Sequence, residues 1–256
     1  MVNLAKIFWS KQIIFHLGRY LILIGQVFQK PEKRSIYHRQ ILVEMERLGL
    51  DSLGIVAIIS VFMGAVVTIQ TAFNVDSPFI PLYAIGFATR QSVILEFSPT
   101  IISLILAGKV GSRIASEIGT MRVTEQIDAL EIMGINAATY LIFPKVIASV
   151  LINPVLIIIS MFLAIAGGWA AGVITGLVSS HAFIYGVQAF FQVYDVIYAL
   201  MKTVVFAFII ATVAGYNGFY TSGGALEVGS ASTKGVVFSS IAIILTNLIL
   251  TQLLLA

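Results

Sequence analysis

The sequence contains no cysteine and few charged residues. Because none of the 256 residues is a cysteine, disulfide bonds, thiolate catalysis and cysteine metal sites are excluded. Charged side chains make up only 11% of the chain, whereas hydrophobic residues make up 59% and the mean hydropathy is +1.00. An ordinary soluble domain carries about 25% charged residues. The composition therefore predicts a protein whose natural solvent is lipid.

Motifs for several kinds of chemistry are also absent. The sequence has no G-x-x-x-x-G-K-[ST] phosphate-binding loop, no nucleophile elbow and no pair of catalytic carboxylates. His16, His38 and His181 lie in different segments with no carboxylate at ligand spacing, which argues against a metal site. The net charge of +3 is too small to indicate nucleic-acid binding. We therefore expect no catalytic residue, metal or cofactor in this chain.

Long uncharged runs are what the sequence does contain. A helix needs about 20 apolar residues to cross the core of a bilayer. Four uncharged stretches reach that length: Ser52–Val75, Val146–Tyr194, Thr203–Leu226 and Gly235–Ala256. They lack the alternation of apolar and polar residues that is typical of membrane β-strands. The predicted fold class is an all-α integral membrane protein.

Five transmembrane helices are expected. An outer turn, Asn74–Pro81, is predicted by its Asn, Asp, Ser and Pro residues to separate the first two. The third span is expected to begin after Pro144 and Lys145. The length of the uncharged run 146–194 leaves room for a sixth span, and this alternative stays open. The predicted spans are about Leu53–Phe73, Ser92–Ser112, 146–176, Tyr198–Gly218 and Val236–Leu255.

The distribution of Lys and Arg predicts the orientation. Eight of the fifteen lie in the first fifty residues, which places the N-terminus in the cytoplasm by the positive-inside rule. In the five-span arrangement only Arg90 and Lys202 do not face inward. Apolar residues recur at helical spacing between the early charges, so residues 1–50 predict an interfacial helix before a transmembrane domain over 51–256. A helix that only anchors the chain fits the pattern equally well.

A polar interruption, Lys109–Phe143, separates the second and third predicted spans. It is expected to be helical throughout, with apolar residues on one face and Glu125, Asp128 and Glu131 on the other. Gly134 is placed to end the helix. An acidic face with no lipid to meet suits docking to a soluble partner. A solvated helix that merely connects two spans is the plainer interpretation.

The same stretch resembles the signature of the MlaE family of ABC transporter permeases. The resemblance covers most of the chain from about residue 50 onward and implies that a helix at about 117–134 couples the permease to its ATPase. The family's usual Arg-Glu-x-Gly-Pro motif reads Leu95–Pro99 here, which is a departure. The matching segments are Glu117–Glu131 (EIGTMRVTEQIDALE), Met133-Gly134, Ala107–Ser112, Gly215–Gly218, Gly223–Ala225, Val228-Gly229 and Ala231–Thr233.

The resemblance implies a function and a set of partners. The implied function is that of a permease subunit moving phospholipids between the inner and outer membranes, which maintains outer-membrane lipid asymmetry. It implies a multi-pass protein of the bacterial inner membrane acting as two copies, with ATP and Mg bound by a separate ATPase subunit. An MCE-domain lipid-binding protein and a small STAS-like cytoplasmic subunit are further implied partners. An intramembrane lipid-modifying enzyme and a scaffold without transport stay open as alternatives.

Two sets of site residues follow from the resemblance, which implies a lipid cavity between the two copies. An intramembrane carboxylate is costly unless it is paired or faces water, so Glu96 is the leading cavity residue, and pairing with Arg90 at the headgroup level is the alternative. The predicted substrate-binding residues are Val67, Gln70, Phe73, Val75 and Glu96. The predicted ATPase-coupling residues are Glu117, Gly119, Met121, Arg122, Thr124, Glu125, Asp128 and Met133.

Small residues recur every four positions in two segments. Such stripes allow helix backbones to approach closely in lipid, where no hydrophobic force drives association. Contacts within one chain are the plainer interpretation of each stripe, and a dimer contact is the alternative. The two stripes are Ala107, Gly111, Ala115 and Gly119, and Ala164, Gly168, Gly172 and Gly176.

Overall fold

The computed structural model describes residues 2–29, 34–75 and 80–255, and side chains within 14–29, 37–75 and 80–254. The described residues form helices joined by short turns, which confirms the all-α fold class. In chain order the helices are α1 (Val2–Val27), α2 (Arg34–Asn74), α3 (Tyr83–Ser92), η1 (Val93–Ile101), α4 (Ile102–Leu106), η2 (Ala107–Gly111), α5 (Ser112–Val123), α6 (Gln126–Ile132), α7 (Ala137–Ile174), α8 (Ser180–Gln188), α9 (Val193–Phe219) and α10 (Ala225–Leu255).

Five helical stretches are long and apolar enough to cross a membrane, as predicted. The alternative of a sixth span in 146–194 is wrong within the described residues, because that run holds most of α7 and then only the nine-residue α8 before α9 begins at Val193. The predicted turn at 74–81 includes positions 76–79, which lie outside the described residues. The five stretches are Tyr37–Asn74, Tyr83–Val123, Ala137–Ile174, Val193–Phe219 and Ala225–Leu254.

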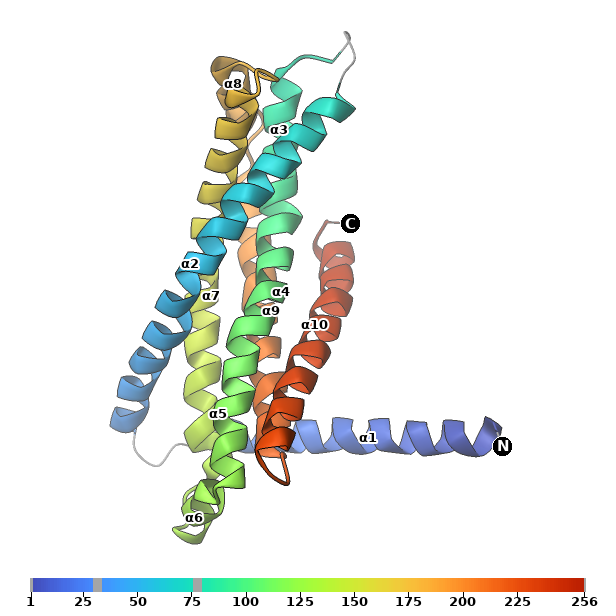
Figure 1. Ribbon diagram of the computed structural model, residues 1–256, viewed down its shortest axis with the longest axis vertical. Helices are drawn as coiled ribbons and strands as arrows, with labels where there is room; N and C mark the ends of the chain where they lie inside the picture. The colour runs from blue at the N-terminus through green and yellow to red at the C-terminus, as the bar shows by residue number, and fades with distance from the viewer. Residues whose placement is uncertain (1, 30–33, 76–79, 256) are drawn as a thin grey trace.

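The long helices run side by side, and α1 lies across one end of them (Figure 1). The short helix α6 projects at the same end as α1, whereas α8 and the start of α3 lie at the opposite end (Figure 1). These are called the α6 end and the α8 end below. The crosswise placement of α1, with Leu17 and Leu21 exposed, agrees with the predicted interfacial helix. The side chains of Lys6, Ile7 and Lys11 lie outside the described residues.

Helices α2 and α7 approach each other at backbone distance. A Cβ atom added to Gly64 would lie 1.8 Å from the carbonyl oxygen of Ala164, and one added to Gly167 would lie 2.3 Å from that of Val61. A Cβ on Gly168 would lie 2.3 Å from Oγ1 of Thr68. The small residues of α7 therefore serve contacts within the chain, which is the plainer of the two interpretations for that stripe.

The second membrane-crossing stretch is not a uniform α-helix. It contains two π-helical segments, η1 and η2, on either side of the short α4. Pro99 lies inside η1 and has no N–H to donate, and the carbonyl of Leu95 lies about one turn before it. The Nζ atom of Lys202 donates to that carbonyl at 3.3 Å. Wide π-turns in membrane-crossing helices are rare and often mark functional positions.

The prediction of helix throughout Lys109–Phe143 is wrong at Thr124 and Glu125. Helix α5 ends at Val123, and Glu125 adopts a left-handed conformation with φ of 60° before α6 begins. A second turn follows α6 at Gly134, whose φ of 78° ends that helix as predicted. Asn136 then caps α7 by accepting a hydrogen bond from the Thr139 N–H at 3.2 Å. The third span therefore starts at Ala137, before Pro144 and Lys145 rather than after them.

Candidate functional site

An ion pair lies within the helix bundle, between η1 and α9. The Nζ atom of Lys202 lies 2.9 Å from Oε1 of Glu96, and the Lys202 side chain is fully buried, whereas that of Glu96 is 42% exposed. The same ammonium group donates to the Tyr198 hydroxyl at 3.1 Å. A buried charge is tolerated only when it is paired and its donors are satisfied. Lys202 meets both conditions.

The second carboxylate oxygen of Glu96 is also bonded. The Thr100 hydroxyl donates to it at 3.1 Å, and the amide of Asn247 on α10 donates to it at 3.1 Å. The hydroxyl of Thr251 lies 3.4 Å from Oε1. Glu96 thus joins η1, α9 and α10, and its carboxylate is a partly exposed polar group within a long apolar helical stretch. Such a group can contact the polar part of an amphipathic ligand.

Sequence reasoning missed most members of this network. Lys202 carried one signal, because it was one of two cations that the positive-inside rule did not explain. Asn247 and Thr251 carried a weaker signal, as polar residues within a long apolar run. Neither signal could name the partner, since α9 and α10 meet η1 only in the folded chain.

The alternative pairing of Glu96 with Arg90 is wrong. The guanidinium group of Arg90 is buried at the α8 end and donates to the carbonyls of Val187 and Ala189 at 2.9 and 2.8 Å. It also lies over the ring of Phe87, with 5.1 Å between the guanidinium carbon and the ring centroid. Arg90 therefore fixes the turn between α8 and α9.

The predicted first-span residues lie on or next to α2, away from the hydrogen-bond partners of Glu96. Val67 is buried, Gln70 and Phe73 are exposed, and Val75 packs against a small apolar cluster that includes Phe183. The partners of Glu96 come from η1, α9 and α10 instead. One copy of the chain does not join the two groups in a single polar network.

The segment α5–α6 forms a bent arm at the α6 end. The guanidinium of Arg122 and the carboxylate of Asp128 are 2.6 Å apart and bridge the break between the two helices. Ile127 is buried and holds α6 against the bundle, whereas Glu125 is exposed. Met133, directly after α6, is also exposed. The arm therefore presents both acidic and apolar groups outward.

The predicted coupling residues divide into two groups in the structure. Three of them contact the rest of the chain: Glu117 pairs with Lys145 at 2.8 Å, Met121 packs against the core, and a Cβ on Gly119 would lie 3.3 Å from Val228. Thr124, Glu125 and Met133 are exposed at the tip of the arm instead. Arg122 and Asp128 lie between the groups because they form the bridge.

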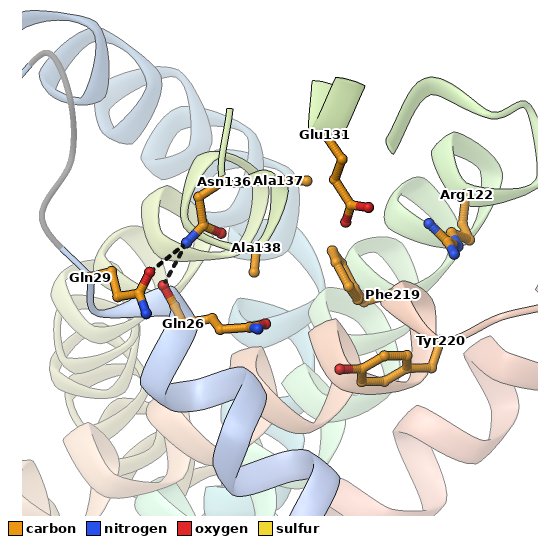
Figure 2. Close-up of a pocket in the computed structure, with 9 residues that line it drawn as sticks. All are labelled: Gln26, Gln29, Arg122, Glu131, Asn136, Ala137, Ala138, Phe219 and Tyr220. Atoms are coloured by element: carbon orange, nitrogen blue, oxygen red, sulfur yellow. Dashed lines mark hydrogen bonds between the residues drawn. The ribbon is translucent and has the colours of Figure 1, made fainter. Parts of the chain in front are cut away.

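A cavity of about 330 Å³ lies beside the arm. Figure 2 shows Asn136 held next to α1, where its amide donates to Oε1 of Gln29 at 3.0 Å and to the carbonyl of Gln26 at 3.4 Å. The cavity therefore separates α1 from the arm, and Asn136 bridges α1 to the start of α7. The lining residues are Gln26, Gln29, Arg122, Glu131, Asn136, Ala137, Ala138, Phe219 and Tyr220.

Helix α1 is also attached to the end of α9. The guanidinium of Arg19 lies 3.6 Å from the ring centroid of Tyr220, within the range of a cation–π contact. The hydroxyls of Tyr20 and Thr212 share a hydrogen bond of 2.8 Å. Burial raises the pKa of Tyr20, and the hydrogen bond with Thr212 opposes that rise. The crosswise helix is thus fixed to the bundle by polar contacts.

Five apolar helices, a crosswise terminal helix and an exposed arm between the second and third crossings define a multi-pass α-helical membrane protein. The sequence profile of the family described as Permease MlaE matches residues 41–253. The chain belongs to this permease family, so it is a transport subunit and not an enzyme.

Relatives of known name match almost the full length of the chain. A probable ABC transporter permease protein of Rickettsia bellii is 38% identical over 237 residues, covering 93% of this chain and 91% of the relative. The intermembrane phospholipid transport system permease protein MlaE of Haemophilus influenzae is 32% identical over 241 residues, covering 93% and 91%. The chloroplastic protein TRIGALACTOSYLDIACYLGLYCEROL 1 of Arabidopsis thaliana is 32% identical over 236 residues, covering 90% of this chain and 66% of that protein.

Proposed function

We propose that this chain is the membrane subunit of an ABC transporter that moves phospholipids between the inner and outer membranes and so maintains outer-membrane lipid asymmetry. The observation that carries the proposal is the match to the Haemophilus influenzae protein over nearly the whole of both chains, since that relative is named a phospholipid transport permease. The Glu96–Lys202 network supports it, because a partly exposed polar group among apolar membrane-crossing helices suits a lipid headgroup.

The proposed location is the bacterial inner membrane, with the α6 end and the N-terminus in the cytoplasm. Lys109, Arg113 and Arg122 all lie on the stretch that leads to the arm, which supports this orientation by the positive-inside rule. The two cations that the rule left unexplained, Arg90 and Lys202, are buried and bonded within the chain. They therefore do not count against it.

The energy source in this proposal is a separate ATPase subunit that binds ATP and Mg. Its docking site is the tip of the arm, where the exposed residues Thr124, Glu125 and Met133 lie. The arm is held against the bundle by Glu117, Gly119 and Met121, and the Arg122–Asp128 bridge holds α6 to α5 within the arm. The apolar and acidic groups at the tip are suited to a groove on a soluble partner.

The proposed lipid cavity forms between two copies of the chain. Glu96 and Gln70 provide its polar groups, and Val67 and Phe73 on α2, with Val75 just beyond the helix, provide apolar walls that suit acyl chains. An MCE-domain lipid-binding protein at the α8 end and a small STAS-like cytoplasmic subunit would complete the assembly. Domain boundaries at 1–50 and 51–256 belong to the same proposal.

The test is purification of the chain in mild detergent, mass spectrometry of what accompanies it, and reconstitution of the purified complex into vesicles. We expect an ATPase, an MCE-domain protein and phospholipid to be recovered, and ATP-dependent lipid transfer to follow. The double variant Glu125→Lys/Asp128→Lys should lose the ATPase without unfolding the spans. A chain recovered without ATPase and without lipid would favour a scaffold that does not transport.

A further inference from the structure

A second ion cluster, centred on a buried lysine, joins three helices at the α6 end. The Nζ atom of Lys145 on α7 lies 2.7 Å from Oε1 of Glu44 on α2 and 2.8 Å from Oε2 of Glu117 on α5. The Lys145 side chain is 4% exposed, against 12% for Glu44 and 38% for Glu117. One ammonium group therefore binds carboxylates from two other helices, and none of the three residues belongs to the Glu96 network.

The cluster lies at the base of the arm. Glu117 lies on α5 before the α5–α6 break, and Lys145 lies on α7 after the turn that follows α6. The bond between them therefore joins the helix that leads into the arm to the helix that leads out of it. The bond from Lys145 to Glu44 adds α2, the helix of the first span. The base of the arm, the first span and the third span are thus joined through one side chain.

The burial of this cluster determines how the helices can move. A buried ion pair is costly to break, because separation leaves an uncompensated charge out of water. The pair Asp51–Arg113, which also joins α2 to α5, is 56% and 40% exposed, and such pairs contribute little. A displacement of the arm would therefore open the Asp51–Arg113 contact easily, whereas Lys145 would keep α2, α5 and α7 together.

We propose that Lys145 is a positioning residue that transmits displacement of the arm to the first span through Glu44. This inference rests on the proposed function, in which an ATPase moves the arm and α2 lines the lipid cavity. Lys145 contacts neither nucleotide nor lipid in this mechanism. Its role is to make α2 move when the ATPase displaces the tip of the arm at Glu125. Without this link the arm would bend and α2 would stay in place.

The test uses the complex that co-purifies with the wild-type chain, reconstituted in phospholipid vesicles. The Glu44→Gln variant removes the charge from the link to α2 and leaves the Lys145–Glu117 pair in place. The triple variant Lys145→Met/Glu44→Gln/Glu117→Gln removes the cluster without leaving an unpaired charge. We expect ATP hydrolysis to continue in both, while lipid transferred per ATP falls roughly tenfold, which lies within the range of about 5- to 150-fold that is usual for coupling between sites. Lys145→Arg should retain most transfer.

A distance measurement separates transmission from a merely structural role. Because the chain has no cysteine, spin labels can be placed through Arg39→Cys on α2 and Ala129→Cys on α6 without background. We expect the distance between labels to stay constant on ATP binding in the otherwise wild-type chain and to change in the triple variant. Asp51→Asn, which removes the exposed pair between α2 and α5, is the matched control and should leave both readouts unchanged.

These measurements distinguish a failure of the proposed function from a failure of the proposed role of Lys145. If the wild-type complex transfers no lipid when ATP is supplied, the proposed function itself is wrong. The role of Lys145 alone would be overturned by a different set of results. In that case the wild type transfers lipid, Glu44→Gln transfers as much lipid per ATP as the wild type, and the label distance in the triple variant stays constant on ATP binding. If the triple variant does not fold, Glu44→Gln decides the question alone, because its remaining ion pair keeps Lys145 satisfied.

Discussion

Lys202 and Glu96 form an ion pair of 2.9 Å in which the cation is fully buried and the carboxylate is 42% exposed. Removing one partner therefore has a different energetic consequence from removing the other. Loss of the carboxylate leaves an ammonium group among apolar helices with only neutral oxygens around it. Loss of the ammonium leaves a carboxylate that still accepts from Thr100 and Asn247 and that can meet water or a headgroup.

This asymmetry predicts an order of stabilities. Glu96→Ala should lower the free energy of unfolding by about 3 kcal/mol, because a buried charge loses its partner, and Lys202→Met by only about 1 kcal/mol. The double variant should be more stable than Glu96→Ala alone. Unfolding in mixed detergent micelles measures all three. Equal losses for the two single variants would show that the unequal burial of the pair has no energetic consequence.

The contact between α2 and α7 gives a prediction about glycine. A Cβ on Gly64 would lie 1.8 Å from the carbonyl oxygen of Ala164, so Gly64→Ala forces the helices apart and should cost about 3 kcal/mol or more of unfolding free energy. Gly54 lies on the same helix with no atom within 4 Å of an added Cβ. Gly54→Ala is therefore the control and should stabilise by up to about 1 kcal/mol. Similar values for the two variants would refute the close contact.

Long uncharged runs predict four of the five spans, because a run of about 20 such residues has few other uses in a protein. The second span contains Glu96 and Lys109, and it is predicted by its position between the predicted outer turn and the polar interruption. The criterion of uncharged runs misplaced the start of the third span, because Lys145 looked like a boundary residue. In the structure Lys145 is buried inside α7, where Glu44 and Glu117 neutralise it from two other helices. Local hydrophobicity gives no information about a counter-charge that lies far away in the chain.

The bend of the arm could not be predicted for a different reason. Neither position 124 nor position 125 is a glycine or a proline, which would indicate a break in the helix. The periodicity of the acidic residues also continues across the bend. The structure holds Glu125 in a left-handed conformation because Ile127 is buried behind it and the Arg122–Asp128 pair spans the bend. The capping residue Asn136 did carry a signal, since Asn is typical of helix starts.

The attachment of α1 predicts a change at alkaline pH. Burial raises the pKa of Tyr20, so the folded chain keeps this phenol protonated at a pH where the unfolded chain ionises it, near pH 10. The stability that Tyr20 contributes is therefore present below about pH 10 and is lost as the pH rises through the raised pKa. The absorbance of tyrosinate, measured in the wild type minus Tyr20→Phe, should show one group that titrates late. A difference curve centred on the ordinary pKa would contradict this.

The left-handed conformation of Glu125 predicts opposite effects on stability and on binding. Glycine adopts φ of 60° without the steric cost that a side chain carries, so Glu125→Gly should raise the free energy of unfolding by about 1 kcal/mol. The same change removes a carboxylate from the proposed docking site, so the affinity for the ATPase should fall several-fold. Thermal unfolding and ATPase pull-down measure the two quantities on one preparation.

Glu131 provides the matched control, because it is exposed and acidic but lies inside α6. Glu131→Gly places glycine at a helical position in the last turn of α6 and should lower the free energy of unfolding by up to about 1 kcal/mol, the opposite sign from Glu125→Gly. If ATPase binding depends on the shape of the bend and not on the carboxylate at its tip, Glu125→Gly would bind as tightly as the wild type. The docking site would then have to be sought in the apolar residue Met133 rather than in the acidic face.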